Sequence, residues 1–245
     1  MTRPIETRSG LREPRLGILT GIPMGQESAA ELHGGSMTPS PSTPPPARGP
    51  VARAARRAGI LRAAASAFAR SGYAATSMDE IAAEAGITKL VVYRYFDSKE
   101  ALYRSVLERV FQRLAEEFIA AYSADPMGPG VGARATVTVA REDPDGFRLL
   151  WHHAAREPEF ATYARELREH AVEASRVLFA SWPDPALREW AAQTVVSYVV
   201  EATLNWIEHG SPDRDDEVVG MIAVAVAAAV GAQQGPAGGR GGRRS

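Results

Sequence analysis

Four side chains between residues 89 and 94 have the chemistry to contact a nucleic acid. If residues 88–96 form a helix, one face carries Lys89, Leu90, Tyr93 and Arg94. The two cations can pair with phosphates or with guanine edges, the phenol can donate to a phosphate oxygen, and the leucine can contact a thymine methyl. The opposite face carries Val92 and Phe96, so this helix would have the polar front and apolar back that suit a DNA major groove.

The preceding residues predict two helices that hold this face in place. Apolar side chains recur at helical spacing over residues 53–70, and Gly72 is a suitable end for that helix. The segment SMDE, which begins at Ser77, is a capping box and predicts the start of a second helix. Gly86 ends that helix, and Thr88 can cap the third. This order predicts a helix-turn-helix.

Hydroxyl groups and one further lysine add candidate phosphate contacts around the same face. The hydroxyls of Ser77 and Thr88 lie at predicted helix starts, where free backbone N–H groups also favour anions. Asp97 or Ser98 can cap a long fourth helix, which places Lys99 in its first turn. We therefore expect Ser77, Thr88 and Lys99 to contact the DNA backbone.

These residues also carry a family resemblance. Phe68, Gly72, Tyr73 and Thr76, followed by SMDEIA, AGITK and YRYFDSKEAL, closely resemble the N-terminal domain of TetR-family (tetracycline-repressor-like) regulators. The resemblance implies a homodimer that binds a palindromic operator and usually represses transcription until a small ligand enters its C-terminal domain. It also implies that Thr88, Lys89, Tyr93 and Tyr95 touch DNA, and that Ser77 and Lys99 touch phosphates.

One departure from the family pattern affects base recognition. Leu90 and Val91 stand where the family often has a small residue followed by a hydroxyl residue. This change removes hydrogen-bonding capacity. We expect base readout to depend more on methyl contacts and on Arg94.

Charge is distributed unevenly along a chain whose formal net charge is −1. Residues 48–113 contain 12 basic and 6 acidic side chains, a net charge of +6, whereas residues 114–232 contain 9 basic and 19 acidic ones, a net charge of −10. A basic module joined to an acidic body suits a DNA reader with an attached domain of another function. The chain has no cysteine, which excludes disulfides and thiol catalysis and fits a cytoplasmic protein.

The patterning predicts an all-α fold in four segments. Asp184-Pro185 and Ser211-Pro212 each place a capping side chain before a proline, so the last two helices should form an antiparallel hairpin. The apolar part of the last helix, about fifteen residues, is too short to span a membrane. We expect a disordered tail over 1–49, a helix-turn-helix domain over 50–97, a ligand-binding and dimerisation domain over 98–232, and a flexible basic tail over 233–245.

The C-terminal body offers candidates for a dimer interface and for an effector cavity. A stripe on the last two helices predicts an interface made by Trp190, Thr194, Tyr198, Ala202, Ile222 and Val226, although core helices of a monomer would use the same residues. Aromatic side chains that could line a cavity, or equally fill an ordinary core, are Phe118, Tyr122, Phe147, Trp151, Phe160 and Tyr163. The effector itself is unknown, and the acidic body with its aromatic residues favours an apolar or cationic compound.

Two other classes of function are weaker. An enzyme is disfavoured because the chain has no nucleophile elbow, phosphate loop or dinucleotide fingerprint, and Glu166, Glu169 and Glu173 fit a solvated helix face. We expect no cofactor. We also expect no metal, because the adjacent residues His152 and His153 would point about 100° apart on a helix and could not easily bind the same ion. A protein that coats DNA without sequence preference fits less well with the compact reading face. The sequence therefore predicts a ligand-released repressor that binds double-stranded DNA as a homodimer.

Overall fold

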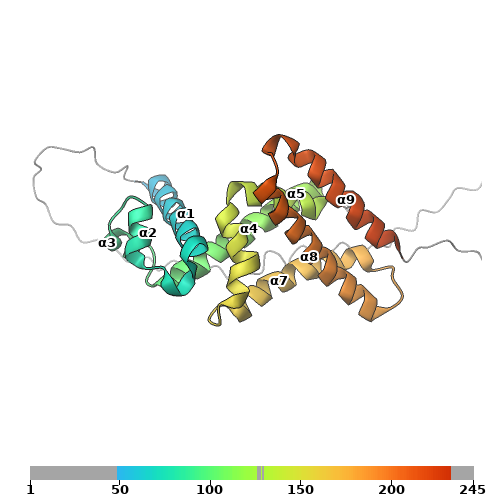
Figure 1. Ribbon diagram of the computed structural model, residues 1–245, viewed down its shortest axis with the longest axis horizontal. Coiled ribbons are helices and arrows are strands. Elements are labelled where there is room, and N and C mark those ends of the chain that lie inside the picture. The colour runs from blue at the N-terminus through green and yellow to red at the C-terminus, as the bar shows by residue number, and fades with distance from the viewer. Residues whose placement is uncertain (1–48, 126–127, 129, 233–245) are drawn as a thin grey trace, which may run out of the picture. The chain divides into compact units, whose positions relative to one another are not determined.

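Every regular element in the described residues is a helix (Figure 1). The structure, a computed structural model, describes residues 49–125, 128 and 130–232. The predicted all-α class is confirmed for this part of the chain. The tails predicted for 1–49 and 233–245 lie outside the described residues, apart from Gly49, and the predicted boundary between residues 97 and 98 stays a prediction.

Three helices form the N-terminal head: α1 (Pro50–Ala75), α2 (Met78–Glu84) and α3 (Lys89–Tyr93). The Ser77 hydroxyl accepts a hydrogen bond from the backbone N–H of Glu80 at 3.1 Å, as expected of a helix cap. Gly72 and Gly86 have φ angles of 77° and 65°, which glycine adopts without the steric cost that a side chain would add. These two glycines let the chain turn after the main part of α1 and between α2 and α3.

The fourth helix joins the head to the body. Ser98 caps α4 (Lys99–Ala124) by accepting from the backbone N–H of Ala101 at 3.0 Å. The helix α4 packs on α1 and along α5 (Val131–Glu142). Buried side chains recur along its first four turns, namely Leu102, Tyr103, Val106, Leu107, Val110, Phe111 and Leu114.

Short elements follow before the next long helix. Asp143 caps α6 (Pro144–Arg148), which continues into a π-helical turn η2 (Leu149–His153) and a 3₁₀ turn η3 (Ala154–Arg156). A proline often stands at the first position of a helix, but α7 (Ala161–Arg176) begins three residues after Pro158. The reason is a turn in which the Glu157 carbonyl accepts from the N–H groups of Phe160 and Ala161, both at 2.9 Å.

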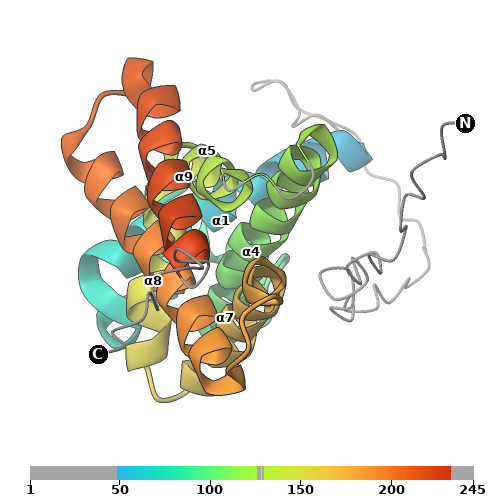
Figure 2. The same ribbon diagram turned by 90° about the vertical axis from the view of Figure 1, so that its right-hand side faces the viewer.

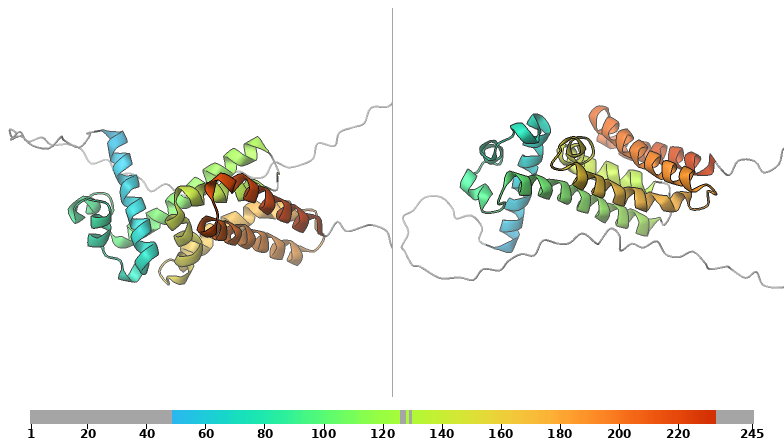
Figure 3. Two further views of the ribbon diagram at one scale, coloured as in Figure 1. Left: turned by 45° about the horizontal axis from the view of Figure 1, so that its top comes forward. Right: turned by 90° about the horizontal axis from the view of Figure 1, so that it is seen from below.

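The last two long helices form the predicted antiparallel pair (Figure 3). After the 3₁₀ turn η4 (Val177–Phe179), Asp184 caps α8 (Pro185–His209) at the predicted residue. The following segment differs, because η5 (Pro212–Arg214) is a 3₁₀ turn and α9 (Asp215–Gly231) starts after it. Both α8 and α9 pack against α5 (Figure 2).

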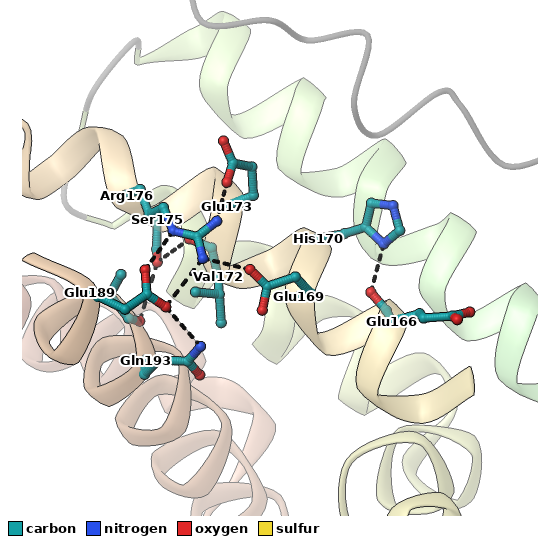
Figure 4. A network of polar contacts seen from close by, with 10 residues as sticks. Glu166, Glu169, His170, Val172, Glu173, Ser175, Arg176, Glu189 and Gln193 are labelled. Carbon is teal, nitrogen blue, oxygen red and sulfur yellow. Dashed lines mark hydrogen bonds and ion pairs between the residues drawn. The ribbon is translucent and has the colours of Figure 1, made fainter. Parts of the chain in front are cut away.

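Ion pairs fasten the helices of the body to one another. Arg176 near the end of α7 binds Glu169 and Glu173 on its own helix and Glu189 on α8 (Figure 4). Glu169 and Glu173 therefore belong to a charged surface, as the sequence predicted. At the α8–α9 turn, Asp215 accepts from Arg141 at 2.9 Å and from the indole of Trp206 at 2.6 Å.

The junction between head and body rests on Lys99 and a group of aromatic rings. Lys99 Nζ donates to the carbonyls of Tyr73, Ala74 and Thr76 at 2.8, 3.2 and 3.0 Å, which holds the end of α1 against the start of α4. Beside it, Phe68, Tyr73, Tyr103 and Phe160 form what we call the aromatic cluster, with centroids of neighbouring rings 4.3 to 6.0 Å apart. Because Phe160 immediately precedes α7, the cluster connects α1 and α4 to the body.

Replacement of Lys99 by methionine tests this junction. Lys99→Met keeps an unbranched apolar stem but leaves three carbonyls without their charged donor, so the free energy of unfolding should fall by about 2 kcal/mol in urea unfolding. Lys89→Met is the matched control, because its partner is an exposed carboxylate and the expected loss is below about 0.5 kcal/mol. Equal losses in the two variants would contradict the role given to Lys99.

The Asp215 contacts predict a dependence of stability on pH. The Arg141 guanidinium, followed by the Trp206 indole, holds the pKa of the Asp215 carboxyl below its usual value. Its stabilising effect is therefore present at neutral pH and is lost as the pH falls and the folded protein takes up the proton. Asp215→Asn should destabilise the protein at pH 7 by about 2 kcal/mol, and the gap to wild type should narrow in thermal melts toward about pH 3.

The neighbouring Asp216→Asn variant serves as the control. Asp216 pairs with Arg134 at a highly exposed position, so its replacement should change the melting temperature little at any pH. A gap between Asp215→Asn and wild type that stays constant with pH would contradict the charge-dependent role of Asp215.

Candidate nucleic-acid interface

The exposed side of α3 carries the residues that the sequence placed there. Val92 is fully buried, and α3 packs against α2. On the other side, Leu90 and Tyr93 are 66% and 43% exposed, which is high for large apolar and aromatic side chains. Arg94, at the end of this short helix, is also exposed. The predicted division of α3 into an inner and an outer face is confirmed, and we call Lys89, Leu90, Tyr93 and Arg94 the reading face.

An acidic neighbour that the sequence reasoning missed modifies this face. Lys89 Nζ donates to the Asp79 carboxylate at 2.6 Å, and this hydrogen bond raises the pKa of Lys89. Both side chains are exposed, so the pair is weak and Lys89 can exchange Asp79 for a phosphate at little cost. The position of Asp79 one residue into α2 was visible in the sequence, but its distance from Lys89 depends on the angle between the two helices.

The remaining predicted contacts of the head differ in how available they are. Ser77 and Thr88 are exposed, and Thr88 makes no side-chain capping bond. Tyr95 is half-buried, with the Arg53 guanidinium 6.0 Å from its ring centre. Arg53 was not among the predicted residues, and its cation adds positive charge beside Tyr95.

Lys99 has partners inside the protein that the sequence did not predict, and its contact with phosphate stays a prediction. The sequence and the family resemblance made it a phosphate contact, but its ammonium group already donates to the three carbonyls at the end of α1. An ammonium has three donors, so Lys99 could bind a phosphate only by giving up one of these bonds. In this structure Lys99 is a positioning residue for the head.

The body contains a cavity of about 180 Å³ between α4, the turns η2 and η3, and the first part of α7. Its apolar walls are Phe111, Leu150, Ala155, Ala161, Ala164 and Leu167, and its remaining lining residues are Trp151, Arg165 and Arg168. Of the six aromatic residues predicted for a cavity, only Trp151 lines this one. The sequence prediction missed the two arginines. Their spacing of three residues places them on one side of a helix, next to the apolar residues Ala164 and Leu167, and this could have been noticed.

The other five predicted aromatic residues have packing roles. Phe147 is fully buried in the core, and Phe160 is a member of the aromatic cluster. Tyr163 lies under the Arg104 guanidinium, and burial raises its pKa to about 12. Phe118 and Tyr122 stack on each other near the end of α4. Aromatic type alone therefore did not distinguish a cavity wall from the core.

The predicted dimer residues fall into two groups. Trp190 and Tyr198 on α8 are 61% and 42% exposed, Thr194 between them is exposed, and Ala202 is half-buried. Ile222 and Val226 must be corrected: each is 2% exposed and packs inside the subunit. The exposed apolar side chains of α9 are instead Met221 and Val224. We call Trp190, Thr194, Tyr198, Met221 and Val224 the α8–α9 face.

Neither a metal cluster nor a membrane span is found in the part of the chain that the structure describes. No three His, Cys, Asp or Glu side chains there are grouped closely enough to bind an ion. His152 Nε2 lies 2.7 Å from Glu201 of α8, so this ring has a structural partner. None of the described helices combines the length and apolar character needed to cross a bilayer.

Comparisons with known proteins identify the head and extend into the body. The family model "Bacterial regulatory proteins, tetR family" matches residues 60–106, which span most of α1, all of α2 and α3, and the first part of α4. The HTH-type transcriptional activator FasR of Mycolicibacterium smegmatis is 29% identical over 179 residues, covering 69% of this chain and 81% of that protein. An uncharacterized HTH-type transcriptional regulator of Mycobacterium tuberculosis is 32% identical over 142 residues, covering 56% of this chain and 69% of that protein.

A solved structure has the same fold across head and body. The TetR-like transcriptional regulator from Rhodococcus sp. RHA1 superposes with a TM-score of 0.61 at 22% identity, covering 75% of this chain and 98% of that one. The family model matches the head, and the two relatives match this chain over the head and much of the body. Both findings agree with the exposed reading face. The chain belongs to the TetR family of DNA-binding transcriptional regulators.

Proposed function

We propose that the protein is a repressor that binds a palindromic operator as a homodimer and is released from it by a small effector. The observation that carries this proposal is the reading face, where two cations, a phenol and a leucine project from a helix whose other side is buried. Cations, a phenol and an apolar side chain together on one exposed helix face supply the groups that contact phosphates and base edges in a DNA groove.

Each residue of the head has a separate role in this proposal. Arg94 pairs with a guanine edge, Leu90 contacts a thymine methyl, and Lys89 and Tyr93 bind phosphates or base edges. Ser77, Thr88 and Tyr95 contact the DNA backbone, which sets the register of the head without reading sequence. Lys99 acts only through the position of α4 relative to α1.

Dimerisation through the α8–α9 face would present two heads to the same side of a duplex. A two-fold interface places the same apolar surface of both copies in contact, so four helices would cover Trp190, Met221 and Val224 together. The two reading faces would then enter successive major grooves about 34–36 Å apart. Two half-sites of opposite direction make the operator a palindrome.

The aromatic cluster supplies a route from the cavity to the head. The first turn of α7 lines the cavity through Ala161 and Ala164, and Phe160, the residue before this helix, packs on Tyr73 and Tyr103 of α1 and α4. If α7 can take two positions, a ligand that binds one of them more tightly favours that conformation. The distance between the two heads of the dimer would then change to one that no longer fits the operator. The protein acts in the cytoplasm, on an operator that overlaps a promoter, so its release from the DNA raises transcription. The relative FasR is named an activator, so repression is part of this proposal.

The proposal is tested by selection of bound duplexes from a random DNA library with the full-length protein. Enrichment of an inverted repeat whose half-site centres are about one helical turn apart would support it. Enrichment of a single unsymmetrical motif would contradict the dimer arrangement, and no enrichment at all would contradict sequence-specific binding.

Arg94→Ala tests base recognition by the reading face. Affinity for the selected duplex should fall by about 1–3 kcal/mol, the usual effect of losing a base contact, and affinity for random duplex should fall less. Fluorescence anisotropy measures both, with Arg156→Ala in the body as a control for the loss of one positive charge. Equal losses on the two duplexes would show that Arg94 contacts only phosphate.

Val224→Arg tests the dimer. A charge in the middle of a contact made by apolar side chains has no partner, so the dimer dissociation constant should rise at least about tenfold in sedimentation equilibrium. Gln112→Arg adds the same charge to an exposed position of α4 and should leave the dimer unchanged. A dimer that persists in Val224→Arg would place the interface elsewhere.

A further inference from the structure

We propose that the cavity of the body binds a small carboxylate with an apolar tail, and that Arg165, Arg168 and the indole N–H of Trp151 bind its carboxylate group. The proposal rests on the proposed function, in which a small effector enters the body, and it specifies the chemistry of that effector. It differs from the apolar or cationic compound that the overall acidity of the body suggested.

The polar side chains of the residues that line the cavity, Trp151, Arg165 and Arg168, are all hydrogen-bond donors. Trp151 Nε1 is a buried donor without a hydrogen-bond partner, which is uncommon in a folded protein. Arg165 and Arg168 add guanidinium groups, and the lining includes no aspartate or glutamate. Polar side chains that only donate hydrogen bonds favour a ligand that accepts them, and a carboxylate is an acceptor that arginines bind strongly.

The two arginines are placed differently from the acidic residues of the same helix. Arg168 is fixed by a 2.7 Å bond to the Ser197 hydroxyl of α8, and Arg165 is exposed where the cavity meets solvent. The glutamate that follows Arg168, Glu169, binds Arg176 at 2.5 Å further along α7 (Figure 4). Glu169 is therefore paired with Arg176, and the guanidinium of Arg168 is bonded to a neutral hydroxyl.

The backbone around the cavity also favours an anion. The first turn of α7 contains no acidic residue, and its cap, Phe160, makes no side-chain hydrogen bond to it. The positive end of this helix borders the cavity and adds a weak attraction for an anion, which Glu157 and Glu159 just before the helix partly offset. Opposite it, the π-helical turn η2 brings both Leu150 and Trp151 into the lining, and π-helical turns occur frequently at binding sites.

The volume limits the size of the ligand. A cavity of about 180 Å³ has room for on the order of a dozen water molecules, or about ten non-hydrogen atoms of an organic acid. The apolar walls on α4 and α7, including Phe111 and Leu167, suit an alkyl chain or a single aromatic ring. Octanoate and phenylacetate are therefore suitable probes.

The test compares ligands that share a tail and differ in the head group. Isothermal titration calorimetry of the full-length protein would measure octanoate against 1-octanol and octylamine, and phenylacetate against phenethylamine. We expect at least one of the two carboxylates to bind at least about tenfold more tightly than its amine and alcohol counterparts. An amine or alcohol that binds as tightly as the matching acid, or the absence of binding by both acids, would overturn the proposal.

Variants then assign the carboxylate contacts. Arg165→Gln is an exposed change that should leave the fold intact and weaken the bound acid at least about tenfold. Trp151→Phe keeps an aromatic wall but removes the N–H, and it should weaken the acid while leaving 1-octanol unchanged. Arg156→Gln removes a nearby cation that does not line the cavity, and it should have no effect. An unchanged affinity in Arg165→Gln and Trp151→Phe would overturn the assignment.

The same samples separate this proposal from the proposed function. Anisotropy with the selected duplex reports DNA binding independently of calorimetry. If the protein binds the selected duplex but its cavity does not prefer acids over amines and alcohols, only the proposal that the effector is a carboxylate would be overturned. Tight binding of an acid that leaves the DNA complex unchanged would support the cavity chemistry and contradict release by ligand.

Discussion

The contact on which the rest of the structure depends is the junction where α1 ends, α4 begins and α7 approaches both. One ammonium group, on Lys99, holds three backbone carbonyls at the end of α1, and the aromatic cluster fills the space beside it. Carbonyls at a helix end need a donor, and edge-to-face rings pack only in a few geometries. The junction therefore fixes how the head sits on α4, and through α4 it fixes the direction of the reading face.

This arrangement gives the two halves of the chain different physical tasks. The head is basic and presents a small set of donors and one apolar side chain on a short, well-anchored helix. The body is acidic overall, yet two arginines and no acidic residue are among the lining of its cavity, and Arg176 pairs with three glutamates outside it. Phe160, just before α7, packs on Tyr73 and Tyr103, and this contact between α7 and the head is the one that the proposed release by an effector requires.

The head could be predicted from sequence because its signals are local. A capping serine, a glycine at positive φ and a helical alternation of buried and exposed residues act within one or two turns, and they correctly predicted which side chains of this helix are exposed. The partners of Lys89 and Lys99 could not be predicted, because both depend on how helices cross. The choice of Ile222 and Val226 was wrong because α9 is apolar almost all round, so periodicity does not say which side faces the core. In the body, aromatic residues serve core and cavity alike, which left Arg165 and Arg168 unnoticed.

The central claim, sequence-specific DNA binding by the reading face, is tested most directly by fluorescence anisotropy on the DNA upstream of the protein's own coding region. The labelled duplex would be titrated with full-length protein in the presence of excess random duplex, at two salt concentrations. We predict tight binding that survives the competitor and weakens with salt in proportion to the phosphates contacted. Binding that the random duplex abolishes, at that site and at every duplex recovered by selection, would contradict the account.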